Sequence, residues 1–143
     1  MLCRVRGLLC ALPLEHVEET MRPLDVERIA GVPAFLCGLA VIRGSAVPVI
    51  DAAMLLGGEL SRPARFVTVK AGQRRIALAV DAVIGVKTIP PGVLDDLPLL
   101  FQRSDTDAVA AVGTLDSELL LVLRSARLVP EGTWAAIDAG GSA

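Results

Sequence analysis

Short apolar runs separated by tight polar turns make up most of this chain. Two such runs flank Arg43-Gly44, and this arrangement predicts a β-hairpin over residues 38–51 with an arginine at or near its tip. Asp51 is expected to cap a short helix over 52–56. Further strands are expected from the same pattern at 2–14 (two short strands about Gly7), 65–70, 75–86, 108–114 and 119–123.

The two halves of the chain repeat the same order of features. Residues 10–19 align with the segment 66 positions later, which places Glu15 over Asp81 and Val17 over Val83. Residues 41–56 align with the segment 73 positions later, and both blocks contain a strand, a polar turn, a strand and a short helix. Such self-similarity is typical of repeated structural units, with chance alignment of apolar runs as the alternative. The equivalent acids are expected to bond turn amides.

Short strands, tight turns and the lack of a long helical pattern predict a mainly β fold of two small pseudo-symmetric barrels, because closure removes exposed strand edges. A half of about 65–70 residues is marginally stable by itself, so the barrels are expected to pack through a hydrophobic seam. The first is expected over approximately residues 1–60 and the second over approximately 64–130. Residues 131–143, which end in Gly-Gly-Ser-Ala, are expected to be a flexible tail.

The composition excludes several classes of partner. Hydrophobic residues are 53% of the chain but aromatic residues only 3%, so the core is built from Val, Leu, Ile and Ala. Single-stranded nucleic acid is a poor partner without stacking side chains, and a net charge of −2 gives no electrostatic footprint for nucleic acid. No uncharged apolar run reaches the roughly 18 residues of a membrane span, and we expect a cytoplasmic protein.

The sequence offers little for catalysis. Its three cysteines and His16 lack the paired spacing of a metal site, so the cysteines are expected to be buried small hydrophobes. No phosphate-binding loop, dinucleotide turn or HExxH motif is present, and His16 has no partner in a recognisable nucleophile motif. We therefore expect no catalytic residues, no metal and no cofactor.

Five segments carry a family resemblance by their order and spacing. They are ALPLEHVEE (11–19), PAFLCG (33–38), IRG with VPVID (42–51), AVDAVIGV (79–86) and AVGTLDSELLLVLRSARLV (111–129). In this the chain resembles the CheW-like domain, the adaptor of bacterial chemosensory arrays, over nearly all of a single domain at 1–130. The resemblance implies two five-stranded SH3-like barrels with short helices, between which strands can cross.

The resemblance also implies a function and a site. CheW-type adaptors are non-catalytic and couple the cytoplasmic signalling tips of chemoreceptors to the regulatory domain of a CheA-type histidine kinase, at membrane-associated arrays. Arg43 matches the arginine of the family's Asn-Leu-Arg-Gly motif, which is tied to this coupling. Val17 and Glu19 match positions near the receptor-binding face, and Val83 and Val86 match positions on that groove.

The residues leave alternatives beside this interpretation. Arg43 is either a partner contact, for which its planar fork of donors is suited, or a structural arginine bonded to local carbonyls or to Asp51. The valines at 17, 83 and 86 either line a groove or point into the core. Val41 stands where the family motif has Asn, which motivates the alternative of a divergent CheW-like protein that binds the kinase or other CheW-like domains without standard receptor binding, in a non-motility or regulatory pathway. A small-molecule-binding barrel or an enzyme with a pocket between the halves is the third interpretation.

Overall fold

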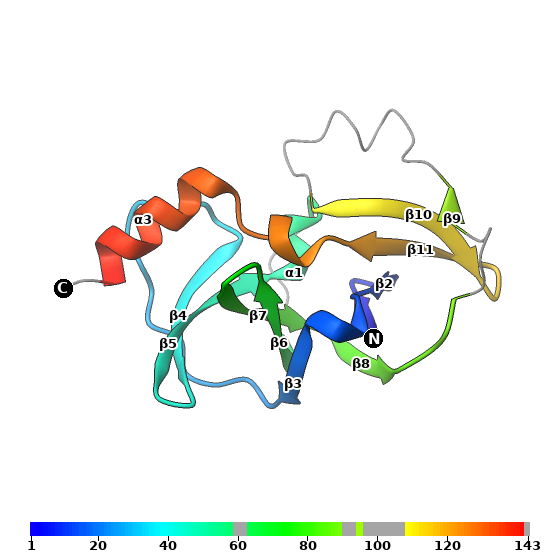
Figure 1. The fold of residues 1–143 in the computed structure, drawn as a ribbon, viewed down its shortest axis with the longest axis horizontal. Coiled ribbons are helices and arrows are strands. Elements are labelled where there is room, and N and C mark those ends of the chain that lie inside the picture. The colour runs from blue at the N-terminus through cyan, green and yellow to red at the C-terminus, as the bar shows by residue number, and fades with distance from the viewer. Residues whose placement is uncertain (59–62, 90–93, 96–107, 142–143) are drawn as a thin grey trace.

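The computed structural model describes residues 1–58, 63–89, 94–95 and 108–141 (Figure 1). The strands are β1 (Leu2–Val5), β2 (Leu8–Ala11), β3 (Val17–Met21), β4 (Leu36–Ile42), β5 (Ser45–Asp51), β6 (Arg65–Ala71), β7 (Arg74–Val80), β8 (Ala82–Gly85), β9 (Leu94–Asp95), β10 (Val109–Leu115) and β11 (Glu118–Leu123). The helical elements are η1 (Leu14–His16), α1 (Ala52–Leu55), η2 (Ser125–Arg127) and α3 (Glu131–Gly141). The mainly β class is as expected.

The strands form two sheets whose membership does not follow chain order. One has six strands in the order β8-β1-β2-β11-β10-β9, and the other has five in the order β3-β6-β7-β5-β4. The sheets are therefore not the segments 1–60 and 64–130, because β1 and β2 join strands of the second half while β6 and β7 join strands of the first. The parallel pairings β11·β2 and β5·β7 make these joins. This exchange is the crossing of strands that the family resemblance implied.

The repeat seen in the sequence is a repeat of structure. Val41 lies opposite Ala46 in the β4–β5 hairpin, and 73 residues later Thr114 lies opposite Leu119 in the β10–β11 hairpin. The parallel joins are equivalent as well, with Val49 beside Ala77 in one sheet and Val122 beside Ala11 in the other. Chance alignment is thus excluded, and the two sheets are pseudo-symmetric. The short strand β9 extends one sheet beyond the expected five strands.

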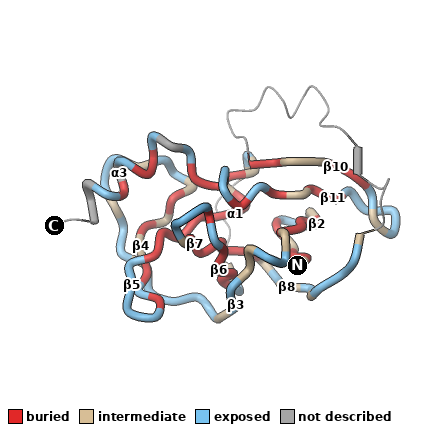
Figure 2. Tube along the Cα trace, viewed as in Figure 1, coloured by how far each residue is buried: buried red, intermediate tan, exposed pale blue. Residues whose placement is uncertain are grey.

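Buried positions lie along strands of both sheets (Figure 2), and the described ones form three clusters, of which the largest spans both sheets. One cluster contains Cys10 and Leu121 of the six-stranded sheet together with Val69 and Leu78 of the five-stranded sheet. This shared cluster is the expected hydrophobic seam, and each fully buried aliphatic side chain stabilises it by about 1.5–3 kcal/mol. Cys3 and Cys10 are fully buried, and burial raises the pKa of their thiols to about 11 and about 12. Both behave as small hydrophobes, as expected.

The predicted helix cap at Asp51 is confirmed, whereas the predicted flexible tail is not. Asp51 caps α1 as predicted, because its carboxylate accepts hydrogen bonds from the amides of Ala53 (2.9 Å) and Met54 (3.2 Å). The prediction of a flexible tail from residue 131 is wrong over 131–141, where the chain forms α3 with Trp134 and Ile137 buried. Apolar side chains three residues apart lie on one helix face, and their burial outweighs the glycine-rich composition.

No helix of the described segments is both long and apolar enough to cross a membrane.

Candidate partner-binding surface

The tip of the β4–β5 hairpin presents Arg43 to solvent. Arg43 and Gly44 form the two-residue turn, with φ of 51° and 79°. Positive φ at both turn residues matches the twist of paired strands and is the favoured geometry for a two-residue hairpin. The turn therefore fixes the backbone at Arg43, whose side chain is 72% exposed.

A bulge in β3 points two neighbouring glutamates toward arginines. The pairing of β3 with β6 shifts register between Val17 and Glu19, so Glu18 is the extra residue. Buried Thr68 holds the bulge, because its hydroxyl accepts a hydrogen bond from the amide of Glu19 (3.1 Å) and lies 3.3 Å from the Glu19 carbonyl oxygen. Bulges commonly re-aim side chains in this way.

Two ion pairs result, and together they form what we call the charged cluster: Glu18, Glu19, Arg43 and Arg75. Arg43 donates to Glu19 Oε2 from Nη2 (2.6 Å) and from Nε (3.1 Å). Arg75 donates to both carboxylate oxygens of Glu18, at 2.6 and 2.8 Å. The four side chains line a cavity of about 240 Å³. Arg43 is therefore not paired with Asp51, which was one alternative.

The electrostatics follow from these contacts. The hydrogen bonds to Glu19 raise the pKa of Arg43, and the hydrogen bonds from Arg75 lower the pKa of the Glu18 carboxyl. The charges of each pair also act on the other pair, so the cluster behaves as one alternating network. Solvent-exposed pairs of this kind contribute little to stability, but they orient their side chains.

The valines expected at the site lie in two places. Val17, in β3, and Val83, in β8, are half-buried and pack against the shared core, so the core alternative holds in part for both. Val86 follows β8, is 64% exposed, and lines a separate cavity of about 330 Å³ together with exposed Leu14. The structure thus joins Arg43 to Glu19, while Val86 belongs to an apolar cavity beside the six-stranded sheet.

Comparison with known proteins decides the family. A profile of the CheW-like domain matches residues 1–132.

The chain belongs to the CheW-like domain family.

It is 28% identical over 102 residues to a probable chemotaxis protein CheW of Rhizobium etli, covering 69% of this chain and 66% of that protein. It is 25% identical over 117 residues to the chemotaxis protein CheW of Klebsiella aerogenes, covering 80% and 70%. The matches span about two thirds of each relative. The crystal structure of the scaffolding protein TtCheW from Thermoanaerobacter tengcongensis has the same fold, with a TM-score of 0.80, 22% identity and 92% coverage of both chains.

Within this CheW-like domain, the second repeat carries a reversed version of the ion pair. Asp116 occupies the turn position equivalent to Arg43, and Lys87 donates to its carboxylate at 3.0 Å. In the five-stranded sheet the pair joins the two edge strands, β3 and β4, whereas in the six-stranded sheet Lys87 follows the edge strand β8 and Asp116 follows β10, beside which β9 forms the other edge. The repeat therefore places an ion pair at both hairpin turns, with the cation on the turn in one repeat and the anion on the turn in the other.

No sequence pattern indicated that Glu18, Thr68 or Arg75 belongs to the surface. Their roles depend on the bulge, which places a residue outside the two-residue alternation of a strand. The repeat extends to this bulge, because β8 has the same register shift between Val83 and Gly85, but that shift is visible only in the structure. Val41, where the CheW-like motif has Asn, is 72% exposed, so no buried polar contact is lost at that position.

Polar side chains near the helical turns of the CheW-like domain connect elements of the fold to one another. His16 Nδ1 lies 3.2 Å from Ser125 Oγ, which connects η1 to η2. Ser125 is almost fully buried, so its hydroxyl is not accessible to a substrate. Asp81 accepts a hydrogen bond from the turn amide of Arg6 at 2.7 Å, as predicted, whereas the equivalent acid Glu15 is an exposed residue of η1 and the same prediction is not confirmed for it. Among the described residues, no three His, Cys, Asp or Glu side chains are grouped to hold a metal ion.

Proposed function

We propose that this chain is a non-catalytic adaptor of a chemosensory array, which couples the signalling tips of chemoreceptors to the regulatory domain of a CheA-type histidine kinase. Membership of the CheW-like family supports this proposal, and so do its relatives, which are known as chemotaxis proteins and as a scaffolding protein. The observation that carries it is the charged cluster, in which an exposed arginine is held in one orientation at a hairpin tip.

The kinase contact is assigned to Arg43 and its surroundings. A guanidinium that is already oriented loses less side-chain entropy on binding, and arginine is enriched among residues that dominate interface energies. Exposed Val41 lies two residues before Arg43, so an apolar contact adjoins the charged one. This combination suits a protein surface that supplies a carboxylate next to an apolar patch.

The receptor contact is assigned to the cavity that Val86 and Leu14 line. Its lining is mostly apolar, and both side chains are at least half exposed. An amphipathic helix binds such a groove through apolar side chains on one face, which fits the helical signalling tip that the family resemblance implies. The two contacts lie at different sheets, so one adaptor can hold both partners, with the chain at the cytoplasmic end of the receptors.

Binding assays with separate fragments test the proposal. The wild-type chain is expected to bind both a CheA-type regulatory domain and a receptor-tip fragment. Arg43→Glu is expected to weaken kinase binding at least tenfold, and Val86→Asp to weaken receptor binding by a similar factor. Arg65→Glu, the same charge change at an exposed position of β6, serves as the matched control. Kinase binding without receptor binding would contradict the coupling role, and so would binding of neither fragment.

A further inference from the structure

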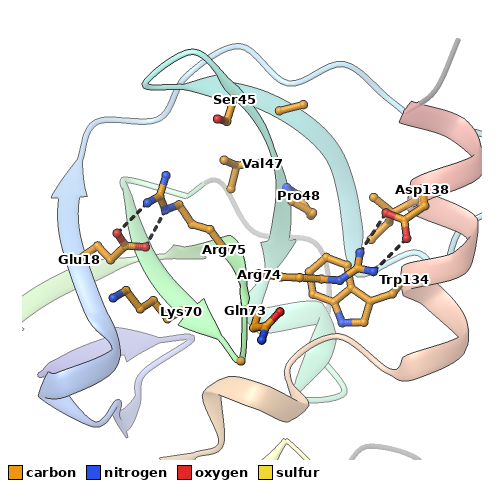
Figure 3. Close-up of a pocket in the computed structure, with 13 residues that line it drawn as sticks. Glu18, Ser45, Val47, Pro48, Lys70, Gln73, Arg74, Arg75, Trp134 and Asp138 are labelled. Carbon is orange, nitrogen blue, oxygen red and sulfur yellow. Dashed lines mark hydrogen bonds and ion pairs between the residues drawn. The ribbon is translucent and has the colours of Figure 1, made fainter.

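Helix α3 extends past the CheW-like domain, because the family match ends at residue 132. It nevertheless docks against the five-stranded sheet at the start of β7, and it lines one side of a cavity that Ser45–Pro48 at the start of β5 also line (Figure 3). Its two described apolar anchors are Trp134 and Ile137, both buried. The helix therefore lies almost wholly outside the family match and covers part of the domain surface.

Arg74, the first residue of β7, holds the helix from outside. Its guanidinium lies 4.5 Å from the centroid of the Trp134 ring and donates to both carboxylate oxygens of Asp138, at 2.9 and 3.0 Å (Figure 3). The side chains of Arg74 and Asp138 are 45% and 59% exposed, so solvent and salt reach this contact. The cation over the aromatic face and the bidentate ion pair fix the orientation of α3. Being exposed, they contribute little to the free energy that holds the helix on the sheet.

The helix has little stability of its own. It has eleven residues, with glycines at 132, 140 and 141, and isolated helices of this length are marginal in water. Docking must therefore supply its order, and the contacts that the described residues make there include the two apolar anchors and an exposed polar contact. Elements with few buried contacts open at lower free energy than core strands.

We propose that α3 is a detachable strap over a helix-binding face, and that the uncovered face binds an acidic amphipathic helix from another protein. The strap face is Ser45–Pro48 at the start of β5 with Arg74 at the start of β7. A helix that replaces the strap is expected to carry the same pattern of side chains on one face. In α3 this pattern is an aromatic, an aliphatic and an acidic residue at positions i, i+3 and i+4, namely Trp134, Ile137 and Asp138.

Charge favours such an occupant. A cavity of about 670 Å³ lies between the strap and the sheet, and its charged lining residues are Glu18, Lys70, Arg74, Arg75 and Asp138. When the strap detaches, Asp138 leaves with it, so three cations then face one carboxylate. Glu18 and Arg75 also belong to the charged cluster, so an incoming helix contacts the same network that orients Arg43. This inference goes beyond the adaptor role and stands on the contacts of α3 alone.

Hydrogen exchange on the wild-type chain tests detachment directly. We expect the amides of α3 to exchange at least a hundredfold faster than those of β6 and β7, and to do so without exposure of the sheet. Exchange of α3 at the rate of the core strands would overturn the proposal. This measurement needs no variant and is unaffected by any folding defect of a mutant.

Binding of a peptide in trans tests the face. Trp134 is the chain's single tryptophan, so the full-length Trp134→Ala variant carries a weakened strap and no tryptophan of its own. A peptide with the sequence of residues 130–143, followed by its tryptophan fluorescence, is expected to bind this variant at least tenfold more tightly than it binds the wild-type chain, measured there by competition. Adding Arg74→Glu is expected to remove that binding, whereas adding Arg65→Glu leaves it. Equal binding to wild type and variant, or no binding to either, would overturn the proposal.

Discussion

Arg43 donates two hydrogen bonds to a single carboxylate oxygen of Glu19, from Nη2 at 2.6 Å and from Nε at 3.1 Å. Glu19 lies in β3, one edge of the five-stranded sheet, and Arg43 directly follows β4, the other edge. Side chains from the two edges of the sheet therefore meet at this ion pair. The contact has two consequences, because it links the two edges through their side chains and fixes the direction of an exposed guanidinium.

Exchanging the two residues separates these consequences. Arg43→Glu alone places two carboxylates together, so we expect a small fall in melting temperature and a large loss of kinase binding. The double variant Arg43→Glu with Glu19→Arg re-forms an ion pair of opposite polarity, so the melting temperature is expected to recover while kinase binding stays weak. Thermal unfolding and titration with the kinase domain measure the two effects. Recovery of binding in the double variant would mean that Arg43 acts through sheet geometry alone.

Replacing Gly38 by alanine is expected to destabilise the protein more than replacing Gly44 by alanine. Gly38 has φ of 145°, and a Cβ atom there would lie 1.9 Å from the carbonyl oxygen of Glu27, whose backbone pairs with Leu39. Gly38→Ala is therefore expected to cost more than about 3 kcal/mol of unfolding free energy, measured by urea denaturation. Gly44 has φ of 79° in open space, so Gly44→Ala is expected to cost about 1–2 kcal/mol. Equal costs would contradict the close approach at Glu27.

The buried carboxylate of Asp51 is expected to stabilise the junction of β5 and α1. Asp51→Ala removes the acceptor for two helix amides and is expected to cost about 1–2 kcal/mol, while Asp51→Asn, which keeps one acceptor oxygen, is expected to cost less. Urea denaturation of the three chains measures this. The exposed Glu15→Ala change is the control, with an effect within about 0.5 kcal/mol. An alanine variant as stable as wild type would exclude a capping role.

Acid is expected to weaken the fold through its arginine-bound carboxylates. Hydrogen bonds from Arg75 and Arg4 lower the pKa of the Glu18 and Glu118 carboxyls from their ordinary value of 4.5. A lowered folded-state pKa stabilises the protein above the unfolded value, and this stabilisation disappears as pH falls below about 4.5 through the folded pKa. Urea midpoints between about pH 6 and pH 3 should fall with acid, with a shallower slope in Glu118→Gln. A midpoint independent of pH would contradict this linkage.

Local pattern was sufficient to predict the hairpins, their equivalence and the Asp51 cap, because apolar alternation and turn chemistry act over a few residues. Local pattern could not predict the exchange of strands between the sheets. The sequences of β2 and β7 do not indicate which distant strand pairs with each of them. The pairing of Glu18 with Arg75 depends on a bulge that breaks the strand period. The helix that contains Trp134 and Ile137 was not predicted, because the glycine-rich end of the chain has a low helix propensity. These two side chains stabilise the helix only when they are buried against the rest of the protein.

The coupling role is tested most directly by simultaneous binding. A receptor-tip fragment is immobilised, and retention of a CheA-type regulatory domain is measured with the wild-type chain, with Arg43→Glu, with the Arg65→Glu control and without any chain. We expect retention only with the wild-type chain and the control, because Arg43 supplies the kinase contact while the receptor cavity is unaffected. Retention with Arg43→Glu at the wild-type level, or no retention with the wild-type chain, would contradict the assignment of this surface.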